Sequence, residues 1–196
     1  MNHHIFNIAA ISAALLLAPC TAVFGQNTGL SQHAQTFLKD MAQGNVAEIE
    51  LGKLAEQKGS TAAIRDFGQR MVRDHTALNN QLKQLASAEN VSLPTTINSQ
   101  QQQEKQNLEH LSGKHFDEQY IKTMLMDHQK DVQAVQQEAE NAQNPQVKML
   151  AAKALPIVED HLRIAENDAG KLGVSSYEGL NQPEHPTGYA GTTASR

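Results

Sequence analysis

Apolar side chains recur at alternating spacings of four and three residues in four long segments of this sequence: 31–58, 60–89, 114–141 and 145–172. This spacing places them on one face of an α-helix. Only Gly59-Ser60 separates the first two segments, so two helices there must be antiparallel neighbours. Asn144-Pro145 makes an equally short break between the last two. The sequence therefore predicts an all-α fold, a four-helix bundle of two antiparallel hairpins over residues 31–172.

The connection between the two hairpins is long and polar. It holds a breaker-rich loop around Pro94 and a weakly helical stretch over residues 100–111. We therefore expect a crossover that contains one short helix. The composition agrees, because Gln, Ala and Leu are abundant while aromatic residues make up only 4% of the chain. Such side chains lose little rotamer freedom in a helix.

The charge pattern excludes two classes of partner. The formal net charge is −5, and Lys and Arg nowhere form a run. A chain without a basic patch is not expected to bind nucleic acid or an anionic membrane surface. The sequence also lacks the Gly-rich phosphate loop, the haem-attachment motif and the nucleophile elbow that mark common enzymes. It assigns no catalytic residue and favours a binding protein over an enzyme.

The amino-terminal region is typical of an exported protein. Residues 5–18 are mostly apolar and too short to span a bilayer comfortably. We interpret residues 1–25 as a signal peptide that is cleaved after Gly25. An alternative is lipid attachment at Cys20, the only cysteine, although Pro19 fits that motif poorly. Either way we expect a periplasmic or outer-membrane-associated protein with no transmembrane span after signal removal.

The carboxyl-terminal segment, residues 173–196, is rich in Gly, Pro, Ser and Thr. It contains too few apolar residues to bury a core of its own. We therefore predict a disordered tail, which leaves residues 31–172 as the single folded domain.

Each predicted long helix carries one polar residue on its apolar face. His75 lies between Met71 and Leu78 on such a face, and His128, His161 and Glu48 take the equivalent places on the other three helices. Neutral imidazoles suit Zn, Cu, Fe and Ni, and a carboxylate balances the charge of the ion. The spacing therefore predicts a transition-metal site, for Cu, Fe or Zn, with these four residues as ligands.

Other residues near this layer allow more than one interpretation. Asp74, Asp127 and Asp160 each precede one of the histidines, and they act either as partners that orient the ligands or as solvated boundary residues. Met71 and Met124 lie four residues before His75 and His128. Their thioethers would favour Cu(I) if they were ligands, but methionine also fills irregular gaps in a core. A buried polar layer can also fix helix register without any metal.

Four stretches of the sequence resemble a known family in order and spacing: FLKDMAQGNVAEIELGKLAEQKGS, FGQRMVRDHTALNNQLKQLA, FDEQYIKTMLMDHQKDVQAVQQEA and ALPIVEDHLRIA. Together they cover about residues 34–172 and are similar to the bacterial exported family of the domain of unknown function 4142, whose members are often labelled predicted outer-membrane proteins. The resemblance implies a ferritin-like four-helix bundle in the cell envelope, with no established activity.

The sequence departs, however, from the pattern of ferritin-like di-iron proteins, which use Glu-X-X-His pairs. Val72, Leu125 and Val158 stand three residues before the histidines. This departure speaks against a metal-dependent oxidoreductase, the third of three functions that we considered. The first is an envelope protein that binds a metal for storage, buffering or stress protection. The second is a non-catalytic structural or interaction module whose polar core layer serves packing specificity. Under each of these functions, a lipid anchor or an envelope protein partner would be the attachment to the envelope.

Overall fold

The computed structural model describes residues 29–174, and within that range it contains five α-helices and no strand. The helices are α1 (Gln32–Lys58), α2 (Ala62–Ala88), α3 (Ser99–Glu109), α4 (Gly113–Asn141) and α5 (Pro145–Leu172). The predicted all-α class is therefore confirmed. The predicted signal peptide with Cys20 and the predicted tail beyond Val174 lie outside the described residues.

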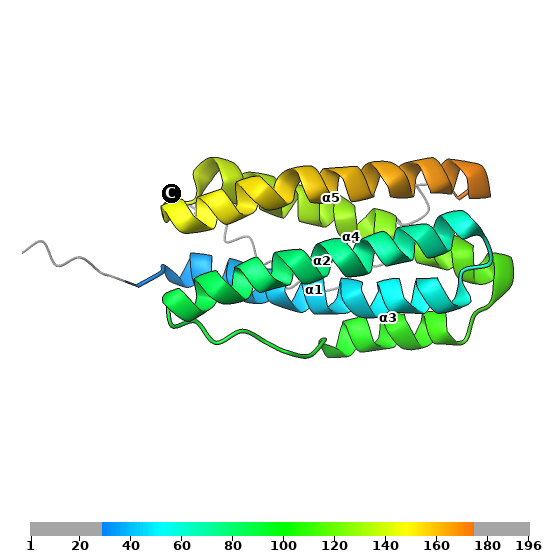
Figure 1. Cartoon of the computed structure of the whole chain (residues 1–196), viewed down its shortest axis with the longest axis horizontal. Helices are drawn as coiled ribbons and strands as arrows, with labels where there is room; N and C mark the ends of the chain where they lie inside the picture. The colour runs from blue at the N-terminus through cyan, green and yellow to red at the C-terminus, as the bar shows by residue number, and fades with distance from the viewer. Residues whose placement is uncertain (1–28, 175–196) are drawn as a thin grey trace, which may run out of the picture.

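The four long helices lie side by side as two antiparallel hairpins, α1 with α2 and α4 with α5 (Figure 1). The two hairpins turn at opposite ends of the molecule, and the crossover carries α3 along the outside of α1. α2 packs on α5, and α1 packs on α4. The middles of the four long helices therefore lie at about the same level of the bundle.

Short polar side chains cap the amino-terminal ends of several helices. The Ser31 hydroxyl accepts the Ala34 N–H at 3.1 Å, and Asn144 accepts two N–H groups of the first turn of α5. Asn98 and Gln101 form a reciprocal capping box at the start of α3. These caps satisfy N–H groups that have no partner inside the helix, so the helix starts are fixed locally.

The α1–α2 turn is tied to α4 by a buried carboxylate. Asp117 accepts the Ser60 N–H at 2.8 Å, the Ser60 hydroxyl at 2.6 Å and the Thr61 N–H at 3.3 Å. These three hydrogen bonds satisfy polar groups of the turn that would otherwise lack a partner. This contact therefore fixes the first hairpin against the second at one end of the molecule.

Two glycines set the distance between α1 and α2. A Cβ atom on Gly68 would lie 2.6 Å from the Gly52 carbonyl oxygen, and a Cβ on Gly52 would lie 2.8 Å from the Gly68 carbonyl oxygen. Any larger residue at either position would push the backbones apart. This close approach also brings α1 and α2 near each other farther along the hairpin. Asn45 of α1 and His75 of α2 can therefore form a hydrogen bond.

The apolar core is divided in two by a polar layer. One cluster holds residues such as Phe37, Leu82 and Leu150, and the other holds residues such as Phe67, Tyr120 and Ala169. Between them each long helix buries polar side chains at mid-length: Asn45, Glu48, His75, His128 and His161. The fold thus brings the polar residues of four helices to one level.

No helix in the described range is both long enough and apolar enough to cross a membrane.

Candidate metal centre

Three histidines from three helices meet in the polar layer. His75 comes from α2, His128 from α4 and His161 from α5, and all three are buried. One ring nitrogen of each lies within 4.8 Å of the corresponding nitrogens of the other two. The ring centroids are 5.2 to 5.8 Å apart. We call this group the histidine cluster.

Each imidazole of the histidine cluster donates its other N–H to a neighbouring oxygen. His75 Nδ1 donates to Asn45 Oδ1 at 2.9 Å, and His128 Nδ1 donates to the Met124 carbonyl oxygen at 3.0 Å. His161 Nε2 donates to Asp74 Oδ2 at 3.1 Å. Metal-binding histidines in proteins are commonly oriented in this way, with one nitrogen bonded to an outer partner and the other free for the ion.

The remaining ring nitrogens have no hydrogen-bond partner among residues 29–174. These are His75 Nε2, His128 Nε2 and His161 Nδ1. Because the opposite nitrogen of each ring carries the proton, the neutral rings turn three lone pairs toward one another. Buried polar atoms without a partner destabilise a protein unless something satisfies them. A cation at the centre of the cluster would satisfy all three.

The environment keeps these rings neutral. Burial, followed by the charges of His128 and His161, holds the pKa of His75 well below its usual range. Burial and His161 lower the pKa of His128 to about 3. Burial also lowers the pKa of His161, although the hydrogen bond to Asp74 opposes it. At neutral pH the lone pairs are therefore available to a metal, and proton transfer by these rings is disfavoured.

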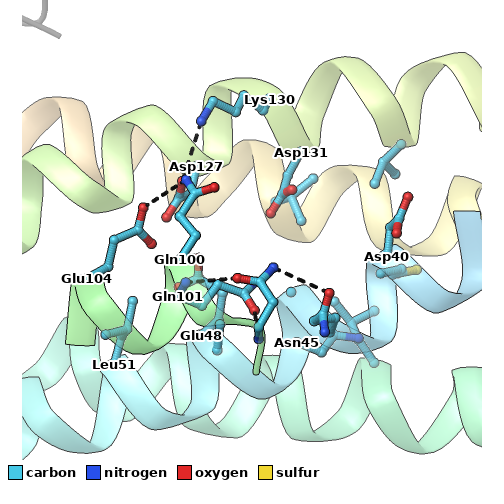
Figure 2. A pocket seen from close by; sticks show the side chains of 18 of the residues that line it. Asp40, Asn45, Glu48, Leu51, Gln100, Gln101, Glu104, Asp127, Lys130 and Asp131 are labelled. Atoms are coloured by element: carbon cyan, nitrogen blue, oxygen red, sulfur yellow. Dashed lines mark hydrogen bonds and ion pairs between the residues drawn. The ribbon is translucent and has the colours of Figure 1, made fainter. Parts of the chain in front are cut away.

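Glu48, the fourth predicted ligand, does not join the histidine cluster: within residues 29–174 the group that could share one ion consists of the three histidines. Glu48 is buried one turn farther along α1 than Asn45 and faces a pocket of about 170 Å³. Carboxyl groups of α1, α3 and α4 surround this pocket, which we call the acidic pocket (Figure 2). Burial and the charges of Asp127, Asp131 and Glu104 raise the pKa of Glu48 well above its usual range.

The predicted outer residues divide between several environments. Asp74 orients His161, whereas Asp160 pairs with Arg70 and Arg163 near the surface. Asp127 turns to the acidic pocket, where burial and the charge of Glu104 raise its pKa to about 7.

Met71 and Met124 are fully buried in the second apolar cluster. Met124 contributes its backbone carbonyl to His128, so this methionine has a contact to the histidine cluster through its main chain. Both positions agree with the interpretation of these methionines as core residues.

Asn45 was missed by the sequence analysis, because the apolar spacing of α1 can also be followed through Gly44, which lies four residues before Glu48. Asn45 is buried and holds His75, while Gly44 lies at the edge of the acidic pocket. The signal was present in the spacing, because Met41, Asn45 and Glu48 follow one another at steps of four and three. An amide on that face can orient an imidazole as well as a carboxylate can.

Comparisons with known proteins show the family of this chain. No curated protein matches the chain. Among solved structures, the crystal structure of a DUF305 fragment from Deinococcus radiodurans is similar, with a TM-score of 0.64 and 16% identity. The similarity covers 74% of this chain and 98% of the fragment, and it concerns the fold alone. The family model for the domain of unknown function DUF4142 matches residues 20–167, and the chain belongs to this family.

Proposed function

We propose that this protein holds one transition-metal ion between His75, His128 and His161 inside a ferritin-like four-helix bundle, and that it serves as a metal-binding protein of the cell envelope. The observation that carries the proposal is the set of three unpartnered ring nitrogens that face one another. Each opposite nitrogen is already fixed to an oxygen from the surrounding helices. The ligands are therefore oriented before any metal arrives.

The chemistry of the donors selects the class of metal. Three neutral imidazoles suit Zn²⁺, copper and iron rather than Mg²⁺ or Ca²⁺, which prefer oxygen. Three histidines also leave one position of a tetrahedral ion for water or another small ligand. Storage, buffering and protection against metal stress are the roles that fit a site without catalytic groups.

The bundle and the location form a separate part of the proposal. Two antiparallel hairpins joined by a crossover with a short helix support the ferritin-like description. The apolar residues 5–18 support export, and Cys20 offers a point of lipid attachment. An exported chain would meet metal ions in the periplasm or at the outer membrane.

A polar layer that only fixes helix register is the second candidate. The split of the core into two apolar clusters favours it, because a layer of matched polar residues resists sliding of one helix past another. The two candidates differ in one measurable property, since a register layer needs no metal.

The experiment offers Fe(II), Cu(I), Cu(II) and Zn(II) to the purified metal-free protein and measures metal content and melting temperature. We expect one equivalent of metal and a higher melting temperature, because a ligand that binds only the folded state stabilises it by mass action. His75→Ala should abolish both effects. His115→Ala, a change at an exposed histidine of α4, should preserve them.

Failure of the wild-type protein to take up any of these ions would refute the metal site and leave the register layer. Oxygen consumption with Fe(II), measured on the same samples, tests the oxidoreductase that the missing Glu-X-X-His pairs disfavour. We expect none above the rate of His75→Ala.

A further inference from the structure

The acidic pocket contains a buried carboxylate that nothing in the described structure satisfies. Glu48 is 4% exposed, and its Oε2 atom has no hydrogen-bond partner. No cationic side chain pairs with Glu48 in the described part of the chain. An ionised carboxylate buried without a partner destabilises a protein strongly, and the raised pKa of Glu48 reflects that cost. The position is therefore explained better by a bound partner than by packing.

The surroundings of Glu48 show which charge that partner carries. Asp40 joins Glu48 from α1, Glu104 comes from α3, and Asp127 and Asp131 come from α4 (Figure 2). Among residues 29–174, Lys130 is the one cationic residue that lines the pocket, and its Nζ lies 3.9 Å from Asp127 Oδ1. Five carboxyl groups thus face a cavity with one ammonium group at its edge. When ionised, such a cluster of carboxyl groups attracts cations and repels anions, and a bound cation favours the ionised form.

The size of the pocket and the spacing of its carboxyl groups point to a hydrated ion. The cavity of about 170 Å³ has room for several water molecules. Within residues 29–174 the carboxylates do not converge as closely as the three histidines do. An ion there must therefore keep part of its water shell, as Mg²⁺ commonly does when it binds through one or two carboxylates.

We propose that this pocket is a second metal site, in which Glu48 and Asp131 bind a hydrated divalent cation of the oxygen-preferring class while Glu104 and Asp127 hold its water molecules. Oxygen donors select Mg²⁺, Ca²⁺ and Mn²⁺ over the ions that imidazole prefers. The site is independent of the histidine cluster, although Asn45 lines the pocket and also holds His75. α3 completes it, which gives the crossover helix a function beyond connection.

The test uses Mn²⁺ as the probe, because its paramagnetism reports binding directly. The full-length protein is stripped with chelator, and bound Mn²⁺ is counted by electron paramagnetic resonance and by calorimetric titration. We expect one bound Mn²⁺ in the wild type. Glu48→Gln and Asp131→Asn should each weaken binding by about tenfold or more, since few carboxylates hold the ion. Excess Mg²⁺ or Ca²⁺ should displace the probe.

Two matched variants define the site. Glu166→Gln removes an exposed carboxylate from α5, outside the pocket, and should bind Mn²⁺ as the wild type does. His75→Ala should also retain Mn²⁺, which separates this site from the histidine cluster. If Glu48→Gln fails to fold, Asp131→Asn decides the question, because Asp131 is only half-buried.

Three results would overturn the proposal. The first is a wild-type protein that binds no Mn²⁺. The second is unchanged binding in the folded Glu48→Gln and Asp131→Asn variants, which would place the ion on the general surface. The third is loss of Mn²⁺ in folded His75→Ala, which would place it between the histidines.

Discussion

The histidine cluster and the acidic pocket are neighbours, and they differ in how their buried polar groups are stabilised. In the cluster every ring is neutral and fixed by a hydrogen bond to Asn45, Met124 or Asp74. In the pocket burial raises the pKa of Glu48, Asp127 and Asp131. Glu48 also has an oxygen that no hydrogen bond in the described structure fixes. The first region is organised before a ligand arrives, and the second is not.

This difference has a consequence for what each region binds. Fixed imidazoles that face one another present soft nitrogen donors at the spacing of a single ion. Separated carboxylates around a wide cavity present hard oxygen donors to an ion that keeps its water. Two adjacent polar regions of one fold are therefore expected to take different metals, and a change aimed at one region should affect the other less.

The largest expected effect is an opposite response of the two regions to pH. The pKa of His128 falls from 6.5 to about 3 on folding, so the unfolded chain binds the proton more readily between these values, and stability is lost as the pH falls through this window. Burial raises the pKa of Asp131 from 3.8 to about 6. Its contribution has the opposite sign, because stability is lost as the pH rises through that window.

Urea denaturation of the metal-free protein between about pH 7 and pH 4 measures this contrast. His128→Gln should lose less stability than the wild type on acidification. The variant lacks the imidazole that takes up a proton in the unfolded chain but stays neutral in the folded one. Asp131→Asn should lose more, because the gain from protonating Asp131 is gone. Parallel curves for all three proteins would contradict the assignment of opposite signs.

A wider spacing between α1 and α2 should harm the histidine cluster more than the pocket. Gly68→Val places side-chain atoms against the Gly52 carbonyl, and overpacking of this kind costs about 1–3 kcal/mol of unfolding free energy. The displaced α1 would also stretch the bond from His75 to Asn45. Thermal unfolding and titration with Zn²⁺ measure both effects. Gly170→Ala, at a helical glycine with no atom within 4 Å, should be neutral or stabilising.

Loss of a single outer hydrogen bond should weaken the metal site without unfolding the protein. Asn45→Ala removes the acceptor that orients His75, and such changes lower metal affinity by about 10- to 100-fold. Competition with a chromophoric chelator measures the affinity for Zn²⁺. Mn²⁺ binding in the pocket should change less, because Asn45 lines that pocket without a charge. Equal losses of Zn²⁺ and Mn²⁺ affinity would mean that the histidine cluster and the acidic pocket form a single metal site.

The sequence predicted the helices and the meeting of the histidines from the same signal. Steps of four and three residues place His75 on one face of α2, and corresponding steps do so for His128 and His161. Because short breaks force antiparallel hairpins, mid-helix residues meet at one level even though the hairpins turn at opposite ends. Local periodicity was therefore sufficient for these three residues.

Periodicity places both Asn45 and Glu48 on the inner face of α1, but it could not tell which of the two meets the histidines. The two residues lie almost one turn apart on α1, and their division between cluster and pocket depends on how α1 is rotated and shifted against α2 and α4. The Gly52–Gly68 contact sets part of that shift. It depends on the meeting of two backbones, which no single helix encodes.

The smallest expected effect separates two aspartates that the sequence could not distinguish. Asp74 and Asp160 each precede a histidine, but Asp74 accepts the His161 N–H while Asp160 pairs with Arg70 and Arg163 at the surface. Asp74→Asn should therefore lower Zn²⁺ affinity by about tenfold or more. Asp160→Asn should leave the affinity unchanged and cost less than about 1 kcal/mol of unfolding free energy, as is usual for exposed ion pairs. Chelator competition and urea denaturation of the two variants measure these quantities. Equal loss of affinity in both would show that the charge of this surface, rather than the orientation of one imidazole, governs the metal site.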